Sequence, residues 1–285
     1  MFKNKALKNA VNSLLVVAGL VSTVPLAWAN TDIQTILASD YRSAENKARD
    51  QYRHPAESLQ FFGLKPTMHV LEIWPAKGWY TEILAPYLKD QGQLTIARNR
   101  RNDGNLDDAK KIHWARLSDK LDQDIAKHAD YFGKVQSLEF DPPAMLHLGG
   151  VNTYDMIISC RNAHVWNEQG YLLDVFRSFY DALKPGGILA MEEHRSSTLS
   201  AIFSRAGEGY LDEYYVIQVA KEAGFELAAR SEINANPKDT KDYPRGVYAL
   251  PPTLAMGEQD KAKYLAIGES DRMTLKFVKP QPALN

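Results

Sequence analysis

Short apolar runs alternate with longer amphipathic segments along most of the chain. The runs expected to form strands cover residues 69–73, 93–97, 135–140, 154–160, 188–192, 225–229 and 274–278. Segments with helical spacing lie at 80–89, 107–128, 169–183 and 212–223. Because most neighbouring runs are separated by a helix-length segment, the pattern predicts parallel β-α-β units.

The sheet expected from this pattern has helices on both faces. Its strands read as continuous apolar runs, which is typical of strands buried on both sides. A long segment without a clear crossover helix joins the last two strands, so these two predict an antiparallel pair at the sheet edge. The expected fold class is α/β, with a Rossmann-like, mostly parallel sheet, helices on both faces and an antiparallel last strand.

Further segments precede, interrupt and follow the expected main domain of residues 67–280. Residues 30–66 predict an N-terminal helical extension with a break near 52–55, where Pro55 suits a first helical position and Gly63 a helix end. Residues 234–271 form an insert whose first part, residues 234–245, is polar and turn-rich and is either a solvated loop or a lid or binding loop. Residues 281–285 form a short tail.

The first 29 residues have the features of a secretory signal peptide. Lys3, Lys5 and Lys8 give a basic start, residues 14–26 are mostly apolar, and Ala27-Trp28-Ala29 is a small-x-small cleavage site. The alternative is a membrane anchor, but the apolar segment is shorter than the roughly 20 residues that a helical span needs. We therefore predict export to the periplasm, cleavage after Ala29 and no membrane contact by the mature protein.

Composition limits the classes of partner. Removal of the three lysines of the leader takes the formal net charge of the 285-residue chain from −1 to −4. A mildly acidic protein is a poor match for the phosphate backbone, so we expect no nucleic-acid partner. Cys160 is the only cysteine, which rules out a disulfide within the chain and suits a small strand residue better than a nucleophile. The oligomeric state is left open.

The most informative segment lies around the first strand, at residues 69–73. Glu72 stands near the end of this strand, and a turn with Pro75, Ala76 and Gly78 leads into a helix. A strand, a turn of small residues and a helix N-terminus form the nucleotide side of an open α/β sheet. Small residues let the backbone approach a ligand closely, although an ordinary strand-to-helix turn gives a similar pattern.

This segment and four later ones resemble the class I S-adenosylmethionine-dependent methyltransferases. In chain order the later segments are Phe140-Asp141, Tyr154-Asp155-Met156-Ile157-Ile158, Lys184-Pro185-Gly186-Gly187 and Ala223-Gly224-Phe225. Arg161-Asn162-Ala163-His164, Ser231-Glu232-Ile233-Asn234 and Gly268-Glu269-Ser270-Asp271-Arg272 are similar to a narrower group of exported bacterial proteins that are predicted methyltransferases. The resemblance covers about residues 43–280.

The resemblance implies the class I methyltransferase fold, S-adenosylmethionine as the cofactor and methyl transfer to a small molecule. It implies that Asn99 faces the ribose and Asp141 the adenine. The full set of implied cofactor-binding residues is Glu72, Trp74, Pro75, Ala76, Gly78, Thr81, Asn99, Asp141 and Asn162.

The chain departs from the family pattern at three of these positions. Trp74 and Ala76 stand where the superfamily prefers glycine, and the second strand leads to Asn99 without the usual ribose-binding acid. Together with the predicted export, these departures motivate an alternative, a non-catalytic ligand-binding protein that retains the fold. A nicotinamide-dependent dehydrogenase is a weaker alternative, because the turn lacks the glycine spacing of that class.

The expected catalytic residues follow the fourth and fifth strands, at the edge where open α/β sheets bind ligands. His164 is the first choice for a base and His194 the second, because imidazole titrates near neutral pH. Arg161 is a candidate for holding an anionic substrate. Each of these side chains also suits a structural role at a strand end. The seven histidines are scattered without paired ligand spacing, so no metal site is predicted.

Overall fold

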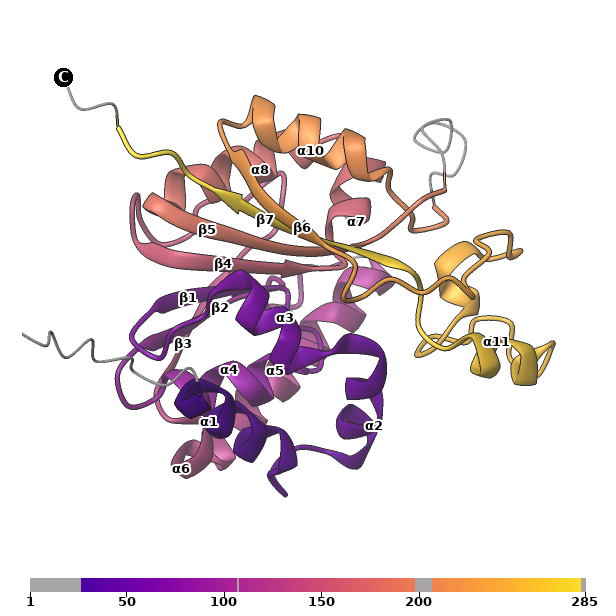
Figure 1. Cartoon of the computed structure of the whole chain (residues 1–285), viewed down its shortest axis with the longest axis horizontal. Coiled ribbons are helices and arrows are strands. Elements are labelled where there is room, and N and C mark those ends of the chain that lie inside the picture. Colours follow the sequence, from indigo (N-terminus) through magenta and orange to yellow (C-terminus); the bar gives the residue numbers. More distant parts are fainter. Residues whose placement is uncertain (1–26, 107, 198–206, 283–285) are drawn as a thin grey trace, which may run out of the picture.

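The computed structural model describes residues 27–106, 108–197 and 207–282, and for residues 27–32 only the backbone (Figure 1). Residues 1–26 of the predicted leader lie outside this part of the chain, so the leader and the periplasmic location stay predictions. None of the helices within the described ranges has both the length and the hydropathy needed to cross a membrane.

Seven strands form one sheet in the order β3-β2-β1-β4-β5-β7-β6. Their bounds are β1 His69–Ile73, β2 Gln93–Arg98, β3 Val135–Glu139, β4 Tyr154–Cys160, β5 Leu183–His194, β6 Glu226–Ser231 and β7 Arg272–Val278. The first five run parallel, and β7 is antiparallel to both of its neighbours, β5 and β6. This topology confirms the predicted α/β architecture with its antiparallel last strand.

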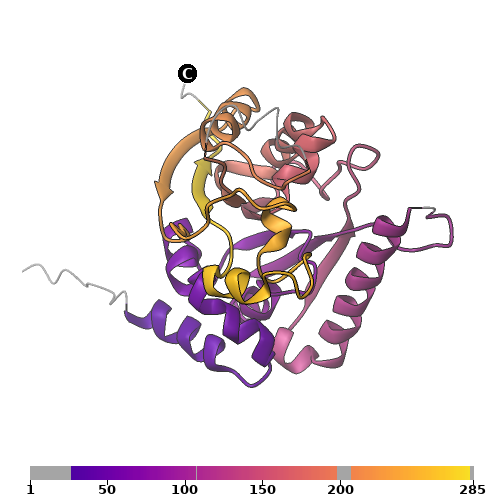
Figure 2. The same cartoon turned by 90° about the vertical axis from the view of Figure 1, so that its right-hand side faces the viewer.

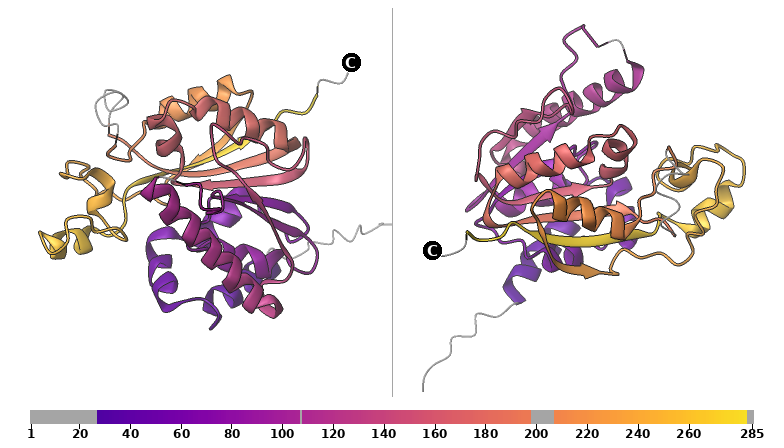
Figure 3. Two further views of the ribbon diagram at one scale, coloured as in Figure 1. Left: turned by 180° about the vertical axis from the view of Figure 1, so that it is seen from behind. Right: turned by 90° about the horizontal axis from the view of Figure 1, so that it is seen from above.

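Helices cover both faces of the sheet, as the apolar strands predict (Figure 2). One apolar cluster joins the sheet to α7 (Ala163–Glu168), α8 (Leu172–Ala182) and α10 (Glu213–Glu222). A second cluster joins the other face to α1 (Ala27–Ala38), α3 (Pro55–Phe62), α4 (Thr81–Leu88), α5 (Ala109–Lys127) and α6 (Ala129–Phe132). Figure 3 shows these layers from behind and from above.

Helix α4 contains Pro86, which we expect to kink it or end it early. The helix ends at Leu88, two residues after the proline. A proline has no N–H for the carbonyl four residues before it, which here is that of Glu82. The Tyr131 hydroxyl donates to this carbonyl at 3.1 Å. Helix α6 therefore supplies the hydrogen bond that Pro86 removes.

The N-terminal extension forms three helices, with α2 (Ala44–Arg53) between α1 and α3. The predicted break near residues 52–55 is confirmed, because His54 adopts a left-handed conformation between α2 and α3. A second break at residues 39–43 was not predicted. There Ser43 accepts a hydrogen bond from the Asn46 N–H and caps α2. Leu59 and Phe62 of α3 are fully buried, so the extension belongs to the core.

The insert of residues 234–271 lies at the end of the sheet where β5 stops and β7 begins (Figure 1). It contains a 3-10 turn, η1 (Gly246–Ala249), and a short helix, α11 (Lys261–Ile267). The Asn236 side chain donates to the carbonyls of Ile267 and Glu269, and Asp239 accepts from the Asp271 N–H. These hydrogen bonds fix the two ends of the insert to each other.

Two of the differences from the expectation lie at the carboxyl ends of the central strands. Residues 163–168 form helix α7, although no helix was predicted there. Strand β5 extends from Leu183 to His194 instead of covering only 188–192, because β7 pairs with it from Ile188 to His194. The longer strand carries Glu193 and His194 to the edge of the sheet.

Candidate functional site

The turn between β1 and α4, residues 74–78, has the backbone of a glycine-rich loop. Trp74, Ala76 and Gly78 have φ angles of 44°, 53° and 79°. These values lie in the left-handed region, which only glycine enters without steric cost. The Gly78 N–H donates to the Pro75 carbonyl at 2.8 Å and closes the turn. The loop therefore keeps a glycine-type conformation at three alternate positions, although two of them carry side chains.

Glu72 links this turn to the helix that follows it. Its buried carboxylate accepts a hydrogen bond from the Thr81 hydroxyl at 2.7 Å. Burial raises the pKa of Glu72 to about 7, and the hydrogen bonds from Thr81 oppose this shift. Both residues were predicted to contact the cofactor. The structure places them in the interior, where they join β1 to α4.

The Trp74 side chain lies along the edge of the sheet toward β3. Its indole N–H donates to the Phe140 carbonyl at 2.9 Å. The centroid of its ring lies 5.2 Å from that of Trp166. The indole thus forms an apolar wall next to the residue before Asp141, the expected adenine contact.

Gly78 has a packing role as well as a conformational one. A Cβ atom at this position would lie 2.6 Å from the Leu121 side chain of α5. The neighbouring Lys77 is exposed, and its ammonium group lies 3.6 Å from the Glu45 carboxylate on α2. The turn therefore packs closely against α5, while Lys77 extends toward α2.

The residues expected near the ribose and the adenine follow β2 and β3. Asn99 comes directly after β2, and the Ser118 hydroxyl lies 3.5 Å from its side-chain oxygen. Asp141 is half-buried, and the Lys111 ammonium group lies 3.9 Å from its carboxylate. Because β1, β2 and β3 are parallel neighbours, both residues lie at the same edge as the turn.

Asn162 joins the ends of two central strands. It follows β4, and its side-chain amide donates to the carbonyl of Ile73, the last residue of β1, at 3.0 Å. The next residues form α7, so Asn162 also stands at the start of this helix. This contact fixes α7 and His164 relative to the turn.

His164 and His194, here called the histidine pair, lie side by side at the ends of β4 and β5. Their ring centroids are 5.4 Å apart. His164 Nδ1 lies 2.9 Å from a Glu193 oxygen, and His194 Nδ1 lies 2.6 Å from the Ser270 hydroxyl. Both rings are almost completely buried. Burial, assisted by the positive charges nearby, lowers the pKa of His194 well below its usual value, so this ring is neutral.

The same group has features of a metal site and features that oppose one. His164, Glu193 and His194 each offer a ligand atom, and these atoms lie within 4.8 Å of one another. However, one Glu193 oxygen accepts a hydrogen bond from the backbone N–H of His194 at 2.8 Å, and the other accepts one from the backbone N–H of His164 at 3.2 Å. The carboxylate is therefore engaged in orienting the two histidines. A carboxylate that holds one ring nitrogen of a histidine leaves the other nitrogen for chemistry.

Arg161 directly follows β4 and is the third predicted catalytic residue. It has a φ of 61°, a left-handed conformation that is costly for a residue with a long side chain. Its guanidinium group lies 4.0 Å from the Glu269 carboxylate and is partly exposed. The structure thus brings all three predicted catalytic residues to one edge of the sheet.

Sequence reasoning missed Ser270 and Glu269 as partners of these residues. They lie 76 residues after His194 and 108 after Arg161, so only the antiparallel return of β7 beside β5 brings them near. The signal that was available is the polar run 269–272 just before an apolar strand, which belongs to a segment already compared with known methyltransferases.

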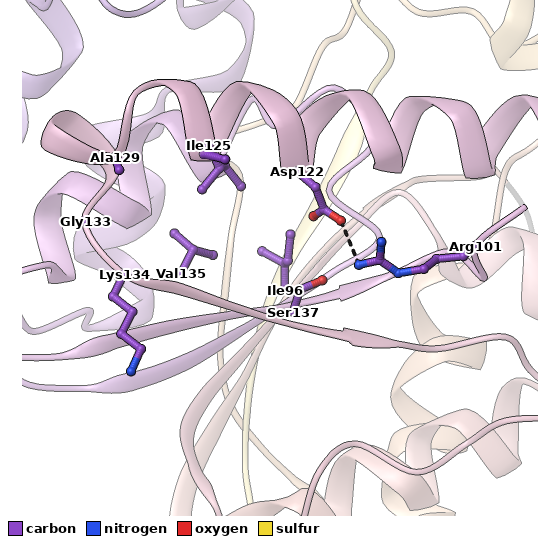
Figure 4. Close-up of a pocket in the computed structure, with 10 residues that line it drawn as sticks. Ile96, Arg101, Asp122, Ile125, Ala129, Gly133, Lys134, Val135 and Ser137 are labelled. Carbon is purple, nitrogen blue, oxygen red and sulfur yellow. Dashed lines mark hydrogen bonds and ion pairs between the residues drawn. The ribbon is translucent and has the colours of Figure 1, made fainter.

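A separate hollow of about 400 Å³ lies between α5 and the outer strands (Figure 4). Ile96, Ile125 and Val135 line it, and the Arg101–Asp122 ion pair stands at one side. None of the predicted site residues lines this hollow.

Comparison with known proteins shows similarity in structure but not in sequence. No family model matches the chain, and no curated protein matches it.

Many solved structures do match. A SAM-dependent methyltransferase from Aquifex aeolicus is 16% identical with a TM-score of 0.53, over 88% of this chain and 98% of that one. The [4+2]-cyclase SpnF is 16% identical with a TM-score of 0.54, over 86% of both chains. Phosphoethanolamine N-methyltransferase 2 of Haemonchus contortus, in complex with S-adenosyl-L-methionine, is 18% identical with a TM-score of 0.50, over 88% of this chain and 60% of that one.

These matches concern architecture, because a fold alone does not determine a reaction. The cyclase among them makes the same point. The strand order, the single antiparallel strand and these structural neighbours together show that the chain has the class I methyltransferase fold.

Proposed function

We propose that this protein is an S-adenosylmethionine-dependent methyltransferase that acts on a small molecule. The observation that carries the proposal is the left-handed backbone at residues 74, 76 and 78, at the carboxyl end of β1. Such a turn lets the main chain approach a ligand, and it occurs here in the fold that such enzymes use. The Trp74 indole supports the proposal by supplying an apolar face beside Asp141, as an adenine ring needs.

Of the remaining predicted residues, some would bind the cofactor and others would act on the methyl acceptor. S-adenosylmethionine, when bound, supplies an electrophilic methyl group. Asn99 and Asp141 would accept hydrogen bonds from ribose and adenine. His164 would take the proton that the acceptor loses as the methyl group is transferred, with Glu193 stabilising the imidazolium that forms. The predicted leader would place this reaction in the periplasm.

Calorimetry of the full chain with S-adenosylhomocysteine tests the proposal. We expect saturable binding that weakens in Asp141→Ala. His164→Gln should leave this affinity unchanged but slow methyl transfer from labelled S-adenosylmethionine to a metabolite extract by about 100-fold or more. His113→Gln, an exposed change on α5, is the control. Absence of binding to either S-adenosylmethionine or its demethylated product would overturn the proposal.

A further inference from the structure

Four arginines gather around one buried carboxylate, that of Glu269. The nitrogens of Arg49 and Arg53 approach it to 2.7 and 2.9 Å. Arg272 approaches it to 3.0 Å, and Arg161 to 4.0 Å. We call these four arginines the arginine cluster. Two come from α2 and two from the ends of β4 and β7, so segments distant in sequence meet at this point.

The charges of this region do not balance. Each guanidinium group is positive at any physiological pH, so the arginine cluster carries four charges. Glu269 supplies one negative charge, and Glu192, which interacts electrostatically with Arg161 and Arg272, supplies at most another. Two positive charges therefore remain, in a protein whose formal net charge is −1. Uncompensated charge away from water is costly, so this region favours an anion.

Several donors of the arginine cluster also lack acceptors. Arg49 Nη2, Arg53 Nη2 and Arg272 Nε are buried, and no atom of the described chain accepts a hydrogen bond from them. Native proteins pair nearly all such groups. The pKa of Arg49 reflects its burial first and this excess charge second. Burial lowers its pKa, the charge of Arg161 adds to this shift, and the opposing effect of Glu269 does not cancel it.

Arg161 connects the arginine cluster to the histidine pair. It follows β4 directly, three residues before His164, in the left-handed conformation that is unfavourable for a residue with a Cβ. Such strain is concentrated at functional sites. The charges of Arg161 and Arg272 both act on His194, which places the positive region beside the histidine pair.

From these observations we propose that the arginine cluster binds an anionic group, a carboxylate or a phosphate, of the methyl acceptor. Arg161 and Arg49 are the two partly exposed members, so they would meet the anion first. A guanidinium group matches the geometry of both anions with paired N–H donors. The identity of the ligand as the methyl acceptor rests on the proposed function, whereas the anion site itself does not.

The positive charge of the arginine cluster also bears on whether the neighbouring histidine pair binds a metal ion. A dication there would be repelled by Arg161 and Arg272, whose charges add to the effect of burial in lowering the pKa of His194. Both oxygens of Glu193 are occupied by hydrogen bonds. The observations therefore favour an anionic acceptor over a metal ion.

Inorganic phosphate is the probe for this site. We expect calorimetry at constant ionic strength to show saturable phosphate binding to the full chain, weakened at least about tenfold in Arg161→Gln. Arg161→Lys, which keeps the charge, should bind phosphate between these two limits and serves if the Gln variant fails to fold. Arg177→Gln is the control, because it removes an equal charge from the exposed surface of α8.

Two ligands of the cofactor class separate the sources of the anion. S-adenosylhomocysteine carries a carboxylate, and 5′-methylthioadenosine does not. If Arg161→Gln weakens the binding of S-adenosylhomocysteine alone about tenfold, Arg161 binds the carboxylate of the cofactor. The inference about the acceptor is then overturned. It is also overturned if phosphate does not bind, or if Zn²⁺ binds through His164 and His194 instead. If S-adenosylhomocysteine binds and phosphate does not, the proposed function stands and the anion site is overturned. If phosphate binds and S-adenosylhomocysteine does not, only the proposed function is overturned.

Discussion

At the scale of single residues, the turn after β1 combines a glycine-type backbone with two side chains that strain it. Ala76 has a φ of 53° and Trp74 a φ of 44°. A left-handed conformation costs about 1–2 kcal/mol per residue with a Cβ. Trp74 recovers part of this cost through its hydrogen bond to Phe140 and its packing on Trp166. Ala76 has only a methyl group with which to do so.

Replacement of Ala76 by glycine should therefore stabilise the protein. We expect Ala76→Gly to raise the free energy of unfolding by about 1 kcal/mol and the melting temperature by roughly 2–4 °C. The reason is that glycine adopts the left-handed conformation without the steric strain that a Cβ causes. Ala48→Gly, at an exposed position in α2, is the matched control and should lower stability by about 1 kcal/mol. Two changes of the same sign in thermal unfolding would contradict the argument.

Replacement of Trp74 tests whether the indole receives a ligand or obstructs it. We expect Trp74→Ala to weaken S-adenosylhomocysteine binding about tenfold, because the adenine loses an apolar face. Calorimetry measures the change, and Trp114→Ala, an exposed tryptophan of α5, is the control. Tighter binding by Trp74→Ala would mean that the indole fills the adenine position in the free protein.

The sequence predicted which residues reach the active edge, but not what each one does there. Their positions at the carboxyl ends of the fourth and fifth strands located His164, His194 and Arg161. Motif comparison placed Glu72 and Thr81 among the cofactor-binding residues, and the structure adds that the two are hydrogen-bonded to each other inside the protein. Their contact depends on the angle between β1 and α4, which residue types do not determine.

At the scale of elements, the buried Glu72–Thr81 hydrogen bond joins β1 to α4 below the turn. The site favours the neutral form of the Glu72 carboxyl group, since burial raises its pKa to about 7. Cys160 at the end of β4 is a neighbouring titratable group, and burial raises the pKa of its thiol, with smaller contributions from the charges of Glu192 and Glu72. The join between strand and helix is thus sensitive to pH.

We expect the stability of this join to fall as pH rises from about 4.5 to 7. Over this range the folded protein keeps a proton that the unfolded chain releases, so folding becomes less favourable with increasing pH. Glu72→Gln stays neutral and can still accept from Thr81. Its advantage over the native protein in urea unfolding should grow by up to about 3 kcal/mol between pH 5 and 8. Glu57→Gln on the exposed face of α3 is the control. If the free energies of unfolding of Glu72→Gln and the native protein differ by the same amount at every pH, the pKa of Glu72 is not raised.

Element prediction succeeded where the apolar pattern was continuous and failed where pairing decided the bounds. Strands β1 and β4 were predicted to the residue, because each has a short run of apolar residues between turn-forming segments. Strand β5 was too short in the prediction, since its last residues are polar and are held only by β7. Helix α7 has six residues and was missed for want of a periodic stretch.

At the scale of the whole molecule, the N-terminal extension is tied to the last strand. The Asn234 side chain donates to the hydroxyls of Ser58 on α3 and Thr274 on β7, at 3.0 and 3.1 Å. Glu269 makes a similar connection to Arg53 on α2. These contacts span up to 216 residues of sequence, which is why the extension was predicted as a separate segment and not as part of the core.

A truncated chain beginning at Lys65 should therefore fail to unfold cooperatively. It loses the fully buried Leu59 and Phe62 and leaves Glu269 with fewer cations, and each lost core side chain costs about 2–5 kcal/mol. Circular dichroism during heating measures the loss. A chain beginning at Asn30, which lacks only the predicted leader, is the control and should melt like the full chain. An unchanged transition in the shorter chain would show that the extension is dispensable.

The contact between Trp74 and Trp166 gives the protein an optical signal of its own. These are two of only five tryptophans in the chain, and their rings lie 5.2 Å apart beside the expected adenine contact. Indole emission depends on whatever touches the ring. Binding of a nucleoside beside this turn should therefore alter the intrinsic ultraviolet fluorescence, so that unlabelled compounds can be screened in a cuvette. Trp74→Phe would report how much of that signal arises at the turn.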